Sequence, residues 1–122
     1  MSDFDQRPEA ERLRAAVGQL VRIHAGLRED LAAVRRDPLL HCLAFCASLR
    51  VHHQSEDGVF PRIEAQFPQL APVIERLRAE HADLARRIAE LEEQPDPAVL
   101  DRLARELEEH FALEERELSR VR

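Results

Sequence analysis

Apolar side chains recur at steps of three and four residues along four stretches of the chain, which is the period of one buried helix face. The helices expected from this period span about residues 8–35, 38–57, 72–93 and 97–120. Asp37-Pro38 and Asp96-Pro97 each offer an N-cap followed by a proline at the first helical position. Because short connections join antiparallel neighbours, we predict an all-α, up-down-up-down antiparallel four-helix bundle that takes up residues 1–122 as a single domain.

The second helix is expected to end or kink soon after Asp57, because Gly58 and Pro61 both disfavour a helix interior. Residues 62–70 are then expected to form no more than a short helical turn. The first two helices resemble the last two, as if one helical hairpin were used twice. The buried stripe of the second helix should contain Cys42, Phe45, Leu49, His52, Glu56 and Val59.

The composition is that of a small helical domain. The chain has 122 residues, three glycines and neither tryptophan nor tyrosine, which leaves little material for a β-sheet. Its net charge of -6 is spread over mixed-sign runs, which argues against binding to a nucleic-acid backbone. No stretch has the pattern of a secretory signal or a membrane span. We therefore expect a cytoplasmic protein with no nucleic-acid or membrane partner.

Cys42 and Cys46 lie four residues apart on the second predicted helix. Their Cβ atoms would be too far separated for a relaxed disulfide. We interpret both as small buried core residues in a reducing compartment, with half of a zinc site as the alternative.

Polar residues interrupt all four apolar stripes at related positions. A histidine followed four residues later by a glutamate occurs on the second helix and again on the fourth, and single histidines precede these pairs by 28 and 29 residues. The six residues are His24, His52, Glu56, His81, His110 and Glu114. In an antiparallel bundle they fall within about two helical turns of one another, so one layer of the core receives four imidazoles and two carboxylates.

Burying these six groups without partners would cost more free energy than a small domain can absorb. Two cations remove that cost, because each glutamate can bridge two metals while two imidazoles bind each metal. Nitrogen and carboxylate donors without thiolate suit iron or manganese best, with zinc as a further alternative. We therefore predict a dinuclear metal site whose ligands are the six residues. The plainer alternative is a metal-free helical interaction bundle with histidines satisfied in its core.

Two further histidines fall off the apolar stripes. His41 lies near the start of the second helix, far from the polar layer, and is expected at the surface or its boundary. His53 lies one residue, about 100° of rotation, from the stripe. We therefore leave it out of the ligand set, with contact to the metal or its bound water as the alternative.

The motifs resemble those of the hemerythrin-like family, the HHE cation-binding domains, over about residues 10–120. The segments that carry the resemblance are His52-His53-Gln54-Ser55-Glu56, Val59-Phe60-Pro61, Glu80-His81 and Glu109-His110-Phe111-Ala112-Leu113-Glu114. The resemblance implies a four-helix bundle around a non-haem di-iron site with an oxo or hydroxo bridge. It implies further that His24 and His52 bind one iron, that His81 and His110 bind the other, and that Glu56 and Glu114 bridge them.

The chain departs from the oxygen-carrying hemerythrins at two points. Those proteins present two histidines one turn apart on the third helix, whereas the neighbours of His81 at that spacing are Leu77 and Ala85. They also commonly bridge with an aspartate five residues after the last histidine, whereas here Glu114 follows His110 by four. The chain thus resembles the divergent branch of the family, which lacks the second third-helix histidine and includes iron and oxygen sensors.

Two functions follow from this resemblance. The first is a sensor or binding module whose di-iron centre binds or reacts with O2 or a related small oxidant, peroxide or nitric oxide. The alternative is a di-iron oxidoreductase that decomposes peroxide or reduces O2, which the missing imidazole would favour by leaving more exchangeable positions.

Overall fold

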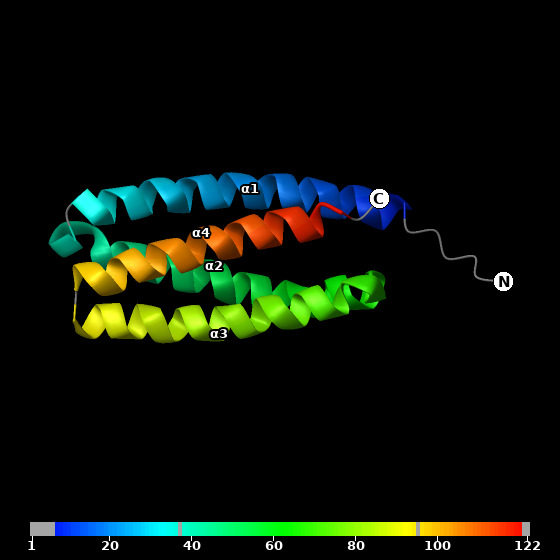
Figure 1. Cartoon of the computed structure of the whole chain (residues 1–122). Helices are drawn as coiled ribbons and strands as arrows, with labels where there is room; N and C mark the ends of the chain where they lie inside the picture. The colour runs from blue at the N-terminus through cyan, green and yellow to red at the C-terminus, as the bar shows by residue number, and fades with distance from the viewer. Residues whose placement is uncertain (1–6, 37, 95, 121–122) are drawn as a thin grey trace.

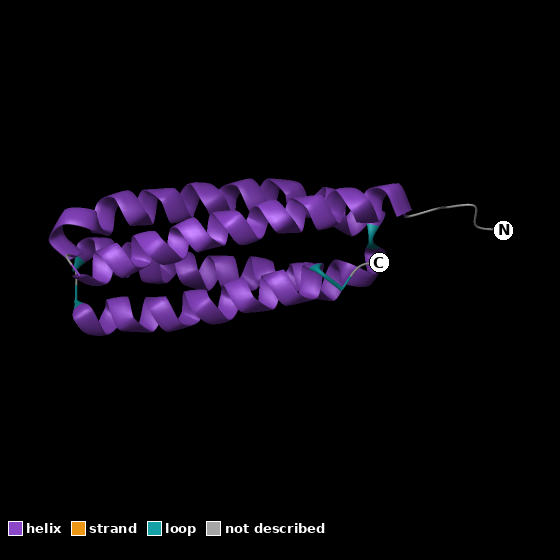
Figure 2. Cartoon of the chain, turned by 90° about the horizontal axis from the view of Figure 1, so that it is seen from above, coloured by secondary structure: helices purple, strands orange, loops and turns teal. Residues whose placement is uncertain are grey.

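The computed structural model describes residues 7–36, 38–94 and 96–120, without the side chains of residues 7 and 38–44. Four long helices form the bundle: α1 (Arg7–Arg36), α2 (Pro38–Gln66), α3 (Ala71–Glu93) and α4 (Pro97–Leu118) (Figure 1). A short 3-10 turn, η1 (Pro68–Leu70), lies between α2 and α3. The helices pack in a ring, α1 on α2, α2 on α3, α3 on α4 and α4 on α1. Figure 2 shows the loops gathered at the two ends, and the predicted four-helix bundle is confirmed.

The second helix is longer than we predicted from the sequence. α2 continues through Pro61 to Gln66, so the expected end after Asp57 is wrong. Proline inside a helix removes one backbone hydrogen bond and costs roughly 3 kcal/mol. Burial offsets this cost, because Phe60 and Phe67 are each 1% exposed, and burying such a side chain contributes about 1.5–3 kcal/mol. Buried apolar residues, Leu49 before and Phe60 after, therefore flank the segment of α2 that carries His52 and Glu56.

The buried stripe of α2 also differs from the prediction beyond Glu56. It continues four residues later with Phe60, so that Val59 lies on the outside and is 47% exposed. The expectation that Val59 faces the core is therefore wrong. The stripe from Phe45 to Glu56 is buried as predicted, and so are all six predicted positions of α3.

Other expectations fall on the ends of the helices. Asp96 caps α4 as predicted, since its side chain accepts a hydrogen bond of 2.9 Å from the backbone N–H of Ala98. Cys46 is fully buried, as expected for a small core residue. The expected cap at Asp37 and the expected positions of the side chains of His41 and Cys42 lie outside the described part of the chain.

The core consists of two apolar clusters with a polar layer between them. One cluster fills the end of the bundle where α1 meets α2 and includes Leu31, Phe45, Ile88 and Leu103. The other fills the opposite end and includes Leu13, Phe60, Ile74 and Leu118. The predicted metal ligands lie between these clusters along every helix.

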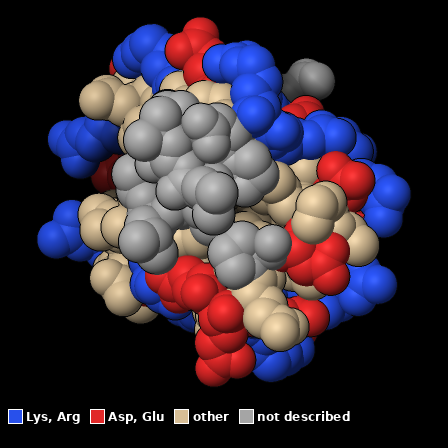
Figure 3. All heavy atoms as spheres, turned by 90° about the vertical axis from the view of Figure 1, so that its left-hand side faces the viewer, with Lys and Arg blue, Asp and Glu red and all other residues tan. Residues whose placement is uncertain are grey.

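One end of the bundle carries many charged side chains. Figure 3 looks at the end where α1 finishes and α4 begins, and shows basic and acidic side chains interspersed around its rim. In the described part of the chain, none of the helices combines the length and the apolar character needed to cross a bilayer.

Candidate metal centre

The six residues predicted as ligands lie together in the middle layer of the bundle, and all six side chains are buried. His24 comes from α1, His52 and Glu56 from α2, His81 from α3, and His110 and Glu114 from α4. The Nε2 atoms of His24 and His52 are 3.1 Å apart. Those of His81 and His110 are also 3.1 Å apart. The two histidines of each hairpin, His24 with His52 and His81 with His110, thus lie together in the structure.

The donor atoms form two groups, each spanning no more than 4.8 Å. The first group consists of His53, Glu56, His81 and His110, and the second of His24, His52, Glu56 and Glu114. Glu56 belongs to both groups, which is the position of a bridging carboxylate. Glu114 belongs to the second group, and its Oε2 atom is 4.0 Å from Nε2 of His110. The two glutamates are therefore not equivalent, whereas the sequence suggested symmetrical bridges.

His53 is the residue of this centre that sequence reasoning set aside. Its side chain is buried, and its ring stacks on that of His81 with centroids 4.1 Å apart. Consecutive helical residues point about 100° apart, so His52 turns towards α1 while His53 turns towards α3 and α4. The signal in the sequence was the His-His pair itself, because a helix buried against neighbours on two sides can serve two seams with consecutive residues. His53 offers the first group a third imidazole, which α3 lacks.

Carboxylates on neighbouring helices orient three of the histidines. The Nδ1 contacts are His24 with Oε2 of Glu115 (2.7 Å), His81 with Oδ1 of Asp57 (2.8 Å) and His110 with Oε1 of Glu80 (2.8 Å). An ionised carboxylate only accepts hydrogen bonds, so the ring proton lies on Nδ1 and a neutral ring presents the lone pair of Nε2 to the interior. Metal-binding histidines are commonly oriented in this way.

In His81 and His110, this orientation of the rings brings two inner nitrogens close together. Their Nδ1 atoms donate to Asp57 and Glu80, so the two Nε2 lone pairs of the neutral rings face each other across 3.1 Å. Oε1 of Glu56 adds another lone pair 3.5 Å from Nε2 of His81. Burial lowers the pKa of His81, but the nearby carboxylate of Glu56 and the hydrogen bond to Asp57 outweigh burial, so the pKa is raised. A metal ion or an added proton has to lie among these atoms.

Burial keeps other rings of the centre neutral, which is the form that binds metal. Loss of hydration, together with the nearby rings of His81 and His110, lowers the pKa of His53 to about 2. Loss of hydration also lowers the pKa of His24 to about 4, although the hydrogen bond to Glu115 acts in the opposite direction. The pKa of His110 is lowered for the same reason, against its hydrogen bond to Glu80.

The two buried glutamates divide one negative charge unequally. Burial raises the pKa of Glu114, and the neighbouring charge of Glu56 raises it further. Burial would raise the pKa of Glu56 as well, but its contacts with His52, His81 and Glu114 outweigh burial and lower it. Glu56 is therefore the ionised member of the pair. Oε1 of Glu114 lies 3.1 Å from Nε2 of His24 without the alignment of a hydrogen bond.

The donor set fits metal ions. Within the centre, four buried atoms have no hydrogen-bond partner among the described residues: Nε2 of His53, Oε1 of Glu56 and both carboxylate oxygens of Glu114. Each such atom costs roughly 1–3 kcal/mol unless something else binds it. Imidazole nitrogens and carboxylate oxygens without a thiolate suit iron, manganese and zinc. These residues thus have the donor chemistry, and the buried atoms without partners, of groups that could hold a metal ion.

A four-helix bundle with histidines and glutamates facing inward defines a class of metal-binding bundles. The family of hemerythrin HHE cation-binding domains matches residues 6–121, nearly the whole chain. The chain belongs to this family, as the motifs predicted, and the bundle is a cation-binding module with histidine and glutamate clusters that could hold the metal. No curated protein and no solved structure matches it.

Proposed function

We propose that the middle layer holds a pair of iron ions and that this centre binds O2 or a related small oxidant, peroxide or nitric oxide, as a sensor or binding module. The observation that carries the proposal is the opposed pair of His81 and His110, whose inward nitrogens lie 3.1 Å apart while both outer nitrogens donate to carboxylates. The family match supports the cation, and the chemistry of the donors supports its identity.

Each metal position has its own set of ligands in this proposal. His53, His81, His110 and Glu56 bind one ion, and His24, His52, Glu56 and Glu114 bind the other. The set contains more imidazoles than carboxylates, which favours iron or zinc over manganese. Among these two, only iron changes oxidation state, which a response to an oxidant requires.

A bound iron pair supplies reversible electron transfer and coordination positions for a diatomic or peroxide ligand. The surrounding residues shield and orient it. The ring of Phe111 stacks on His24 with centroids 4.0 Å apart, and that of Phe60 stacks on His81 at 5.6 Å. These aromatic contacts shield the rings of His24 and His81, while the carboxylates behind the histidines hold their rings in the metal-binding orientation. The chain contains no tyrosine, so no phenolate can serve as a ligand.

Elemental analysis of protein purified without added metal tests the proposal, together with an optical spectrum of the oxidised protein. We expect iron as the main metal and an absorption band of a coupled ferric pair. After anaerobic reduction, the protein should take up O2 in proportion to its iron and release it without continued consumption. Sustained decomposition of peroxide would instead identify the oxidoreductase. Protein that never carries stoichiometric metal would contradict both functions.

A further inference from the structure

The two hairpins, α1–α2 and α3–α4, differ at one contact beside the metal centre. Nδ1 of His110 donates to Glu80, the residue immediately before His81. At the corresponding place in the first hairpin, immediately before the histidine of α1, the chain has Ile23. Among the described residues, no carboxylate contacts Nδ1 of His52. The outer side of His52 is therefore lined by an apolar residue where the outer side of His110 meets a charged one.

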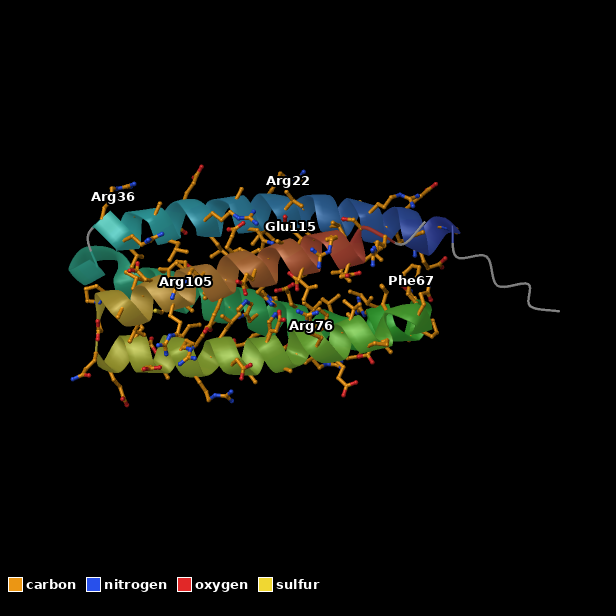
Figure 4. The ribbon with its side chains drawn as sticks, in the orientation of Figure 1. Arg22, Arg36, Phe67, Arg76, Arg105 and Glu115 are labelled. Carbon is orange, nitrogen blue, oxygen red and sulfur yellow. The ribbon has the colours of Figure 1, made fainter. Side chains whose placement is uncertain are left out.

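The difference extends one helical turn further. Arg76 on α3, labelled in Figure 4, donates from Nε to Glu80 at 3.1 Å, so an ion pair covers the outer side of His110. The residue of α1 four positions before Ile23 is the neutral Gln19. The cavity beside His110, between α3 and α4, is accordingly lined mainly by arginines and acidic residues.

Between α1 and α2, the surface beside His52 is hollowed into a pocket of about 300 Å³. The residues that matter here are Leu20, Ile23, Val59 and Phe60 on its walls, with His52 and Glu56 on the side of the metal centre. Ile23 and Val59 are more than 40% exposed, at 44% and 47%, so the pocket opens to solvent. An apolar cavity of about 150 Å³ is enough to bind benzene. This pocket therefore has room for more than a diatomic molecule.

The geometry points to this pocket as the binding site of a small uncharged apolar organic molecule, a single aromatic ring or a short alkyl chain, seated against His52 and Glu56. Glu56 is the charged residue of the lining, and in this proposal the metal engages it, so a charged molecule would give up its hydration without a free partner in the pocket, which is unfavourable. The inference rests on the proposed function for the metal at the inner side of the pocket. The pocket itself is lined by residues of α1 and α2, with Leu118 of α4, and can be tested separately.

Toluene is the probe, titrated into ¹⁵N-labelled protein in zinc-loaded and metal-free forms and followed by NMR. We expect saturable shifts of the amides around Leu20, Ile23 and Val59, and no shifts around Arg76 or Glu106 on the α3–α4 side. In iron-loaded protein, the relaxation of bound toluene protons should rise relative to the zinc form, because the molecule lies beside the metal.

Two substitutions should weaken binding in the pocket, one by adding charge and the other by filling space. Ile23→Glu places a carboxylate beside His52, as Glu80 lies beside His110, and should weaken toluene binding about tenfold or more while the metal content stays the same. Ala16→Phe fills the pocket without adding charge and should weaken binding to a similar extent. The matched control is Val21→Glu, which adds the same charge to an exposed position of the same helix outside the pocket, and should change the affinity less than about twofold.

Shifts spread over the whole surface without saturation would overturn the inference. So would equal affinities of the Ile23→Glu and Val21→Glu proteins, or a sedimentation result showing a dimer whose interface covers Ile23 and Val59. Saturable binding in a protein that fails to hold metal would support the pocket and reject the proposed iron centre. Metal binding with no toluene shifts would support the proposed metal centre and reject the pocket as a binding site.

Discussion

The two hairpins of the bundle share one arrangement around the metal centre and differ in how they close it. In both, the residue after the inward-facing glutamate reaches a histidine of the other hairpin: Asp57 on α2 contacts His81, and Glu115 on α4, labelled in Figure 4, contacts His24. These crossed contacts tie α2 to α3 and α4 to α1. The difference lies on the outside, where the α3–α4 side is covered by ion pairs and the α1–α2 side is apolar and open.

The hairpins also contribute unequally to the centre itself. α2 supplies three donors, His52, His53 and Glu56, and extends nearly three further turns beyond them, to Gln66. α4 supplies His110 and Glu114 and ends one turn later, at Leu118. The comparison teaches that a repeated hairpin can place histidines and glutamates in one layer, while changes at single positions decide which donor group has more imidazoles and which side of the centre is accessible.

The largest effect on metal content should come from replacing the two buried glutamates, and the two replacements should differ. Glu56→Ala should remove nearly all bound metal, because Glu56 belongs to both donor groups, whereas Glu114→Ala should remove about half, because it belongs to one. Loss of the metal's contribution to stability should lower the Tm of Glu56→Ala by roughly 10 °C. Metal per chain, measured by elemental analysis after desalting, checks the ratio.

Glu29→Ala serves as the control for both glutamate variants, because Glu29 is an exposed residue of α1 outside the donor groups. Its metal content and Tm should match those of the unmodified protein. Equal metal loss in Glu56→Ala and Glu114→Ala would show that the glutamates bridge symmetrically, as the sequence suggested.

The next largest effect concerns His53. His53→Ala should release the metal of the first group and retain that of the second, because His53 lies with His81 and His110 and not with His24. Gln54→Ala, a change at the exposed neighbouring residue, should leave both metals in place. Titration with a competing chelator gives the number of metals held and their affinities. Two metals of unchanged affinity in His53→Ala would exclude His53 from the ligand set.

The sequence was sufficient to predict the four helices and the meeting of six polar residues in one layer. Both follow from periodicity, because a polar residue on an apolar stripe has to be buried with the stripe. Leu77, His81 and Leu84 illustrate this on α3, where every predicted stripe position is buried. The ligand roles of the six residues and of His53 stay predictions until metal is measured.

Features that depend on how two helices meet could not be predicted. Local preference ended α2 near Asp57, but the burial of Phe60 and Phe67 carries the helix through Pro61. The pocket depends on Ile23 of α1 lying beside α2, which no spacing within one helix specifies. In each case, contacts between distant parts of the chain outweigh the local pattern.

A smaller effect should come from replacing Glu115 and Asp57, the carboxylates that contact His24 and His81. Glu115→Ala and Asp57→Ala should each weaken metal binding by about 10- to 100-fold, because each carboxylate fixes the ring of a histidine. The loss should be greater for Glu115, which is 21% exposed and bound by Arg28, than for Asp57, which is 47% exposed. Metal affinity from chelator competition ranks the two. A larger loss in Asp57→Ala would reverse this part of the comparison.

The smallest effect should come from replacing Arg28. This arginine binds Glu115, whereas among the described residues no arginine binds Asp57. Its guanidinium lies 3.3 Å from Oε2 of Glu115 and 2.9 Å from Oε2 of Glu108, and it covers the ring of Phe111 at 5.4 Å. Exposed ion pairs contribute only about 0.2–1 kcal/mol, so Arg28→Gln should weaken metal binding less than about fivefold.

The control for Arg28 is another arginine of α1. Arg35 forms a comparable exposed ion pair of 3.1 Å with Asp101, far from the metal centre, so Arg35→Gln should leave the metal affinity unchanged while its effect on the Tm is similar. An equal metal affinity in both variants would mean that Glu115 orients His24 without help from Arg28. A loss confined to Arg28→Gln would show that the α1–α4 side fixes its histidine more firmly than the α2–α3 side, where the described residues place no cation against Asp57.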